Sequence, residues 1–77
     1  MAALVSFLKV SEDGALVRYR FGDDPDACTR YLTVNKESRR SSPDDGRTDY
    51  AFVKASRRIS ALREERGVWP DRGMSAS

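Results

Sequence analysis

The sequence predicts a small α+β domain: a three-stranded antiparallel meander with one C-terminal helix packed on one face, in the order βββα. Two stretches rich in β-branched and aromatic residues flank an Asp-Gly pair at residues 13–14, and a third lies farther along, which is typical of short strands joined by turns. Residues 50–66 instead repeat apolar residues every three or four positions, as an amphipathic helix does. A chain of 77 residues has room for one core, so we expect a single domain over residues 1–70 and a flexible tail over 71–77.

The first two strands are predicted over residues 4–10 and 15–21, joined as a hairpin. Asp13-Gly14 suits a two-residue loop, because a type I′ turn needs positive φ at both central positions. If those two residues are the loop, the cross-strand pairs are Glu12 with Ala15, Val10 with Val17, Leu8 with Tyr19, and Ser6 with Phe21.

Alternation with period two assigns the two faces of the sheet. On the second strand Val17, Tyr19 and Phe21 point to one face, and Arg18 and Arg20 to the other. A third strand is predicted over residues 28–36. Its inward residues would be Cys28, Leu32 and Val34, and its outward residues Thr29, Tyr31 and Thr33.

The helix over residues 50–66 is the clearest element. Residues 37–48 contain no apolar residue and are expected to form a long loop before it. Thr48 or Asp49 would cap the helix, since a side-chain oxygen there can accept from free N–H groups of the first turn. Gly67 would end it in the left-handed conformation. The residues on the stripe that faces the sheet are Phe52, Ala55, Ile59 and Leu62.

Composition argues against catalysis. The chain has no histidine and one cysteine, so it lacks the commonest general base and metal ligand and cannot build a cysteine-rich zinc site. Its five glycines are scattered rather than gathered in a phosphate-binding loop. We therefore expect no catalytic residue, no metal, no cofactor and no small-molecule substrate. Two acidic clusters lack the spacing of a calcium loop and are interpreted as turn and cap residues: Asp23, Asp24 and Asp26, and Asp44, Asp45 and Asp49.

The start of the chain and its cysteine content indicate the compartment. The apolar stretch that opens the sequence breaks at Lys9 and has no basic residues before it, so it is too short to cross a membrane and is a poor signal peptide. The single cysteine excludes an internal disulfide. We expect a cytoplasmic protein without a membrane contact.

The predicted hairpin register leaves one sheet face uncovered, and its side chains form the candidate binding face. Basic side chains interleaved with aromatic rings are what nucleic-acid-binding sheets use, the cations for phosphates and the rings for stacking. An ordinary solvent-exposed sheet and a protein interface, including a dimer, fit the same pattern. The candidate residues are Phe7, Lys9, Arg18, Arg20 and Tyr31, with Val5 and Thr33 beside them.

A secondary basic patch lies on the outward side of the helix at Lys54, Arg57 and Arg58. None of the three has an acidic residue three or four positions later, so the patch lacks the usual pairing within a helix. Glu64 and Glu65 follow on the same side and would repel phosphate, so the helix serves mainly to cover the sheet.

The sequence as a whole therefore predicts a small binding module without enzymatic activity. We expect a regulatory or accessory role through contacts with another protein or with a second copy of the chain. The alternative is nucleic-acid binding through the basic and aromatic sheet face.

Overall fold

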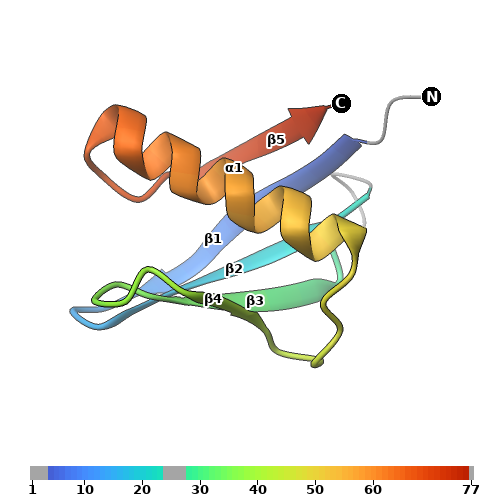
Figure 1. The fold of residues 1–77 in the computed structure, drawn as a ribbon, viewed down its shortest axis with the longest axis horizontal. Helices are drawn as coiled ribbons and strands as arrows, with labels where there is room; N and C mark the ends of the chain where they lie inside the picture. Colours follow the sequence, from blue (N-terminus) through green and yellow to red (C-terminus); the bar gives the residue numbers. More distant parts are fainter. Residues whose placement is uncertain (1–3, 24–27, 77) are drawn as a thin grey trace.

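The protein, described here by a computed structural model over residues 4–23 and 28–76, is a five-stranded antiparallel sheet covered on one face by one helix (Figure 1). The α+β class is confirmed, and two strands are added to the predicted three. The strand order across the sheet is β4-β3-β2-β1-β5. In chain order the elements are β1 (Leu4–Glu12), β2 (Leu16–Gly22), β3 (Arg30–Asn35), β4 (Ser41–Pro43), α1 (Tyr50–Arg66) and β5 (Arg72–Ala76).

The turn between β1 and β2 forms where it was predicted, but its loop is one residue farther along. The Asp13 carboxylate accepts hydrogen bonds from the backbone N–H groups of Ala15 and Leu16, both at 2.7 Å. Asp13 therefore begins the turn with its side chain, as aspartate often does, and Gly14 and Ala15 form the tip. Gly14 does not have a positive φ, so the type I′ turn was a wrong prediction.

The hairpin register differs from the predicted one, and this changes the face of every residue in the first half of β1. A bulge interrupts the pairing between Lys9 and Ser11, and beyond it Phe7 pairs with Phe21 and Lys9 with Tyr19. A shift of one residue exchanges the two faces of a strand. Val5 and Phe7, predicted on the uncovered face, are therefore buried under α1.

Burial of Phe7 is one physical reason for this register. Its side chain is 2 % exposed and its ring meets the Tyr19 ring edge to face, with 5.6 Å between centroids. Burying a large apolar side chain fully contributes about 1.5–3 kcal/mol to stability. The predicted register would leave the Phe7 side chain in solvent and lose this contribution. Among the described residues, the core consists of Val5, Phe7, Val17, Tyr19, Phe21, Leu32, Val34, Phe52, Ala55, Ile59 and Leu62.

The pairing of β2 with β3 places Leu32 and Val34 inward and Tyr31 and Thr33 outward, as the alternation predicts. Cys28 and Thr29, which were predicted to belong to this strand, precede it. Leu32 and Val34 are fully buried, and Tyr31 pairs with Arg20 on the opposite face. Cys28 precedes β3, is half-buried, and lies with its Sγ 3.7 Å from the Ser6 carbonyl oxygen.

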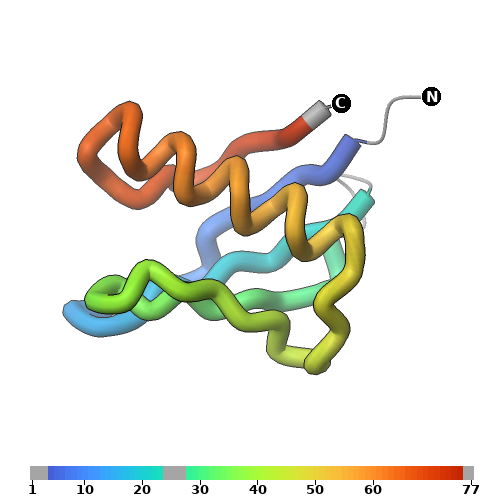
Figure 2. The backbone as a smooth tube through the Cα atoms, in the orientation of Figure 1, coloured from blue at the N-terminus to red at the C-terminus, as the bar shows by residue number. Residues whose placement is uncertain are grey.

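The two added strands lie in segments predicted to be irregular. β4 falls inside the predicted loop over residues 37–48 and pairs with β3 through three polar or proline residues, too few for a periodic signal. β5 falls inside the predicted tail over residues 71–77 and pairs with β1, so the two ends of the described chain run side by side (Figure 2). Phe7 pairs with Gly73, whose missing side chain leaves room for the ring.

The helix has the predicted bounds and caps. Asp49 is the N-cap and accepts from the Phe52 N–H at 3.1 Å, and Gly67 ends the helix at a φ of 76°. After it, the Tyr19 hydroxyl donates to the Pro70 carbonyl at 2.7 Å, and Trp69 packs at the edge of the core. These contacts direct the chain from α1 back to the sheet, where β5 begins.

Candidate binding face

The side of the sheet away from α1, called the open face below, carries a row of four side chains across four strands. Leu8 pairs with Arg72 of β5 on one side and with Arg20 of β2 on the other, and Arg20 pairs in turn with Tyr31 of β3. Paired residues of an antiparallel sheet point to the same face. The cross-strand row therefore reads Arg72, Leu8, Arg20, Tyr31.

Two arginines of this row lack a partner in the part of the chain that the structure describes. Arg20 and Arg72 are both exposed, and no ion pair or side-chain hydrogen bond joins either of them to residues 4–23 or 28–76. An arginine without such a partner keeps its N–H donors available for a carboxylate or a phosphate. They stand on opposite sides of Leu8.

Arg18 is on the open face as predicted, but its charge is already neutralised. Its guanidinium donates to the Asp44 carboxylate through Nε at 2.9 Å and Nη2 at 2.7 Å. Its Cζ also lies 4.4 Å from the centre of the Tyr31 ring. Thr33 holds the same carboxylate by donating to its other oxygen at 2.9 Å. This cluster covers one end of the open face and shields the Tyr31 ring.

Apolar side chains surround the cross-strand row. Leu16 follows the same alternation as Arg18 and is 42 % exposed, and Met74 of β5 is 54 % exposed. Leu8 is half-buried between its arginine neighbours. The open face therefore combines apolar area with uncommitted positive charge.

Lys9 does not belong to this face, which corrects the predicted grouping of five residues. Because Lys9 pairs with Tyr19, its side chain points to the helix side, and it is not opposed to Arg18 as expected. Its Nζ lies 2.6 Å from Glu12 and 3.0 Å from Asp71. These two carboxylates raise the pKa of Lys9, the Glu12 hydrogen bond more than the Asp71 one. Of the five predicted residues, Arg18, Arg20 and Tyr31 lie on the open face, and Phe7 and Lys9 do not.

The secondary basic patch on α1 lies on the outward side of the helix as predicted. Arg57 and Arg58 are exposed, and Lys54 is half-buried with its Nζ 5.3 Å from the centre of the Tyr50 ring. Glu64, farther along the helix, forms an ion pair with Arg39. The patch is separated from the open face by the full thickness of the domain.

A third charged group, around Arg30, has a structural role that the sequence did not indicate. Arg30 donates to Asp45 at 2.8 Å, to Asp49 at 2.8 Å and to the Arg47 carbonyl at 2.9 Å, and it covers the Phe21 ring. The Arg30 hydrogen bond is the main cause that lowers the pKa of Asp45 to about 2. This network ties the segment before α1 to β3.

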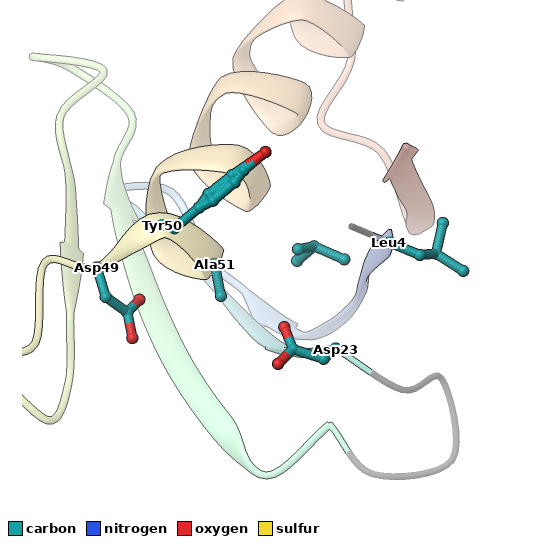
Figure 3. A pocket seen from close by; sticks show the side chains of 6 residues that line it. Leu4, Asp23, Asp49, Tyr50 and Ala51 are labelled. Carbon is teal, nitrogen blue, oxygen red and sulfur yellow. The ribbon is translucent and has the colours of Figure 1, made fainter. Parts of the chain in front are cut away.

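Two hollows of the described structure lie at the start of α1. One, of about 460 Å³, is lined by the beginning of the helix and the ends of β1 and β2, with Asp23 and Asp49 among its residues (Figure 3). In Figure 3 the Tyr50 hydroxyl points away from both carboxylates. Asp49 is committed to the helix cap and to Arg30. A second hollow, of about 290 Å³, shares Asp23 and Asp49 and adds Arg30.

Within residues 4–23 and 28–76, no three metal-ligating side chains gather in one place. In the same part of the chain, no helix is long and apolar enough to cross a bilayer. Comparisons of the chain with protein-family models, with curated proteins and with solved structures found no match. The candidate site therefore rests on the geometry of the open face.

The sequence analysis did not name four residues of this face: Leu8, Leu16, Arg72 and Met74. Leu8 was assigned to the helix side by the wrong hairpin register, Leu16 follows the alternation of Arg18 and Arg20 but was not singled out, and Arg72 and Met74 lie in the predicted tail. For Leu8 the sequence pattern is ambiguous. Val5 and Phe7 are apolar and alternate with Leu8, so both faces of β1 carry apolar residues and either register fits.

Proposed function

We propose that this chain is a non-enzymatic, cytoplasmic binding module that acts in a regulatory or accessory role through protein contacts on its open face. The observation that carries the proposal is the cross-strand row, in which two uncommitted arginines flank Leu8. A sheet face that exposes apolar residues beside unpaired arginines has the composition of an interface core, where arginine is enriched and lysine and acidic residues are depleted.

The chemistry of the face indicates the chemistry of the partner. Leu8, Leu16 and Met74 offer apolar area, which favours an apolar patch on the partner. Arg20 and Arg72 offer fork-shaped donors, which pair best with carboxylates. The expected partner surface is thus apolar and flanked by aspartate or glutamate.

Nucleic-acid binding is the second candidate, favoured by the positive charge of the open face. Among the residues that the structure describes, Arg18, Arg20 and Arg72 outnumber Asp44, the carboxylate paired with Arg18. Stacking is the weaker part of this candidate, because Tyr31 is the aromatic residue of the described open face and Arg18 already covers its ring. Phe7, the other ring on which it depended, is in the core.

The experiment is an amide NMR titration of labelled protein with two probes at low and moderate salt. One probe is a helical peptide whose apolar stripe is flanked by glutamates, and the other is a short DNA duplex. The double variant Arg20→Ala with Arg72→Ala removes the charge of the open face. The matched control, Arg57→Ala with Arg58→Ala, removes the same charge from the helix.

The proposal expects the peptide to shift the resonances of Leu8, Arg20 and Arg72, and expects only the open-face double variant to abolish the shifts. If DNA shifts these resonances and the peptide does not, with an affinity that falls steeply as salt rises, nucleic-acid binding replaces the proposal. If the shifts centre on Arg57 and Arg58, or neither probe shifts the open face, the assignment of this face is wrong.

A further inference from the structure

The two edges of the sheet differ in the backbone groups that they present. At the β4 edge, the hydrogen bonds from Asn35 N–H to Arg40 and from Asp44 N–H to Tyr31 mark alternate pairs along the two strands. In an antiparallel ladder the groups of the intervening residues point away from the neighbouring strand. These are Ser41 and Pro43, and proline has no N–H. Ser41 therefore supplies the single outward N–H of β4.

The β5 edge presents three outward backbone N–H groups. The hydrogen bond from the Lys9 N–H to the Asp71 carbonyl, at 2.7 Å, fixes the alternation between β1 and β5. The groups of Gly73 and Ser75 then point to β1, and those of Arg72, Met74 and Ala76 point outward. Among the described residues, none pairs with these outward groups.

β5 lacks three of the features that protect an edge from pairing: a proline, a bulge and a very short strand. A charged side chain also protects an edge, and β5 carries one, Arg72, which the register given below places opposite an uncharged residue. β4 contains Pro43 and is only three residues long. β5 is five residues long, pairs with β1 without an irregularity and contains no proline. Met74, at its centre, is 54 % exposed.

The geometry points to a second copy of this chain as the occupant of the β5 edge, with the two β5 strands antiparallel and centred on Met74. In that register Met74 faces Met74 of the second copy, and Arg72 faces Ala76 of the second copy. The three outward residues of each strand then exchange up to about six hydrogen bonds. No like charges are opposed, whereas a register centred on Arg72 would oppose two arginines, which destabilises a sheet.

The rest of the fold is compatible with this pairing. α1 packs against β5, β1 and β2, and among the described residues it makes no backbone hydrogen bond to the outward groups of β5. The two-fold axis of an antiparallel pair places both helices on one side and both open faces on the other. The dimer is one continuous sheet, and the inference is independent of the partner proposed for the open face.

The test is the mass in solution from sedimentation velocity, measured from micromolar to millimolar concentration. Wild type is expected to rise from 8.7 kDa toward twice that value, while Met74→Pro stays at the single-chain mass. The Met74 N–H points outward, so its removal leaves the pairing with β1 intact. Ser41→Pro is the matched control, because it removes the outward N–H of the other edge, and it should dimerise as wild type does. Circular dichroism checks that both variants fold.

Amide hydrogen exchange gives a second readout. The Arg72 and Met74 amides should exchange more slowly as concentration rises, and the Ser41 amide should not change. A wild-type mass of 8.7 kDa at every concentration, or a dimer that survives Met74→Pro, overturns the inference. A dimer that survives Met74→Pro and is lost in Leu8→Gln would show that self-association uses the open face, which also overturns it.

Discussion

Gly73 is the position where the structure makes its most specific stability prediction. Gly73 pairs with Phe7, and a Cβ built on Gly73 would lie 2.7 Å from Phe7 Cζ and 3.3 Å from Leu62 Cδ1. The ring cannot easily move away, because its edge-to-face contact with Tyr19 holds it on the other side. We expect Gly73→Ala to destabilise the fold.

The magnitude follows from two opposing effects. Forcing one extra methyl group into a packed core destabilises the fold by about 1–3 kcal/mol. Replacing glycine by alanine stabilises the fold by about 0.4–1 kcal/mol, because it lowers the conformational entropy of the unfolded chain. The net loss should be about 1–2 kcal/mol in the free energy of unfolding. Gly14→Ala is the matched control, since nothing lies within 4 Å of its added Cβ and its φ is not positive, so it should be neutral or slightly stabilising.

The assay is urea denaturation followed by the fluorescence of Trp69, the one tryptophan of the chain. In the Phe7→Leu background the ring atoms nearest to Gly73 are absent, so Gly73→Ala should cost little there. The double-mutant cycle should therefore show a coupling of about 1 kcal/mol or more between the two positions. A neutral Gly73→Ala in wild type, or additivity within about 0.3–0.5 kcal/mol, would refute the pairing of β5 with β1 in this register.

Two further predictions concern charged groups. Asp49→Ala should lower the free energy of unfolding by about 1 kcal/mol more than Asp49→Asn, because both lose the ion pair with Arg30 but asparagine keeps the helix cap; equal losses in urea titrations would contradict the capping role. Hydrogen bonds from Lys36 and Lys9 lower the pKa of Glu12 from 4.5 to about 2. Because the folded-state pKa is the lower one, this pairing stabilises the fold above about pH 4.5 and the contribution is lost as pH falls through about 2. Glu12→Gln should therefore flatten the loss of stability between these pH values, and an unchanged pH profile of urea midpoints would count against the pairing.

The sequence by itself determined the elements whose signal is local. The helix from Tyr50 to Arg66 was predicted with the bounds and buried stripe that the structure has, because an apolar period, an aspartate cap and a terminal glycine all lie within one segment. The second strand and the inward residues Leu32 and Val34 were predicted for the same reason. On the candidate site, the alternation of β2 and β3 placed Arg18, Arg20 and Tyr31 correctly relative to the helix.

Tertiary structure decided what depends on distant contacts. In β1 both alternating sets contain apolar residues, so local pattern could not choose between Phe7 and Leu8 as the buried residue; the turn at Asp13, the bulge at Val10 and the packing of Phe7 on Tyr19 decided it together. β5 has almost no strand signal in its sequence, since residues 72–76 include a glycine, a serine and an alanine. It becomes a strand because Gly73 accommodates the Phe7 ring and because β1 offers it a free edge. The row that brings Arg72 beside Leu8 and Arg20 exists only through that long-range pairing.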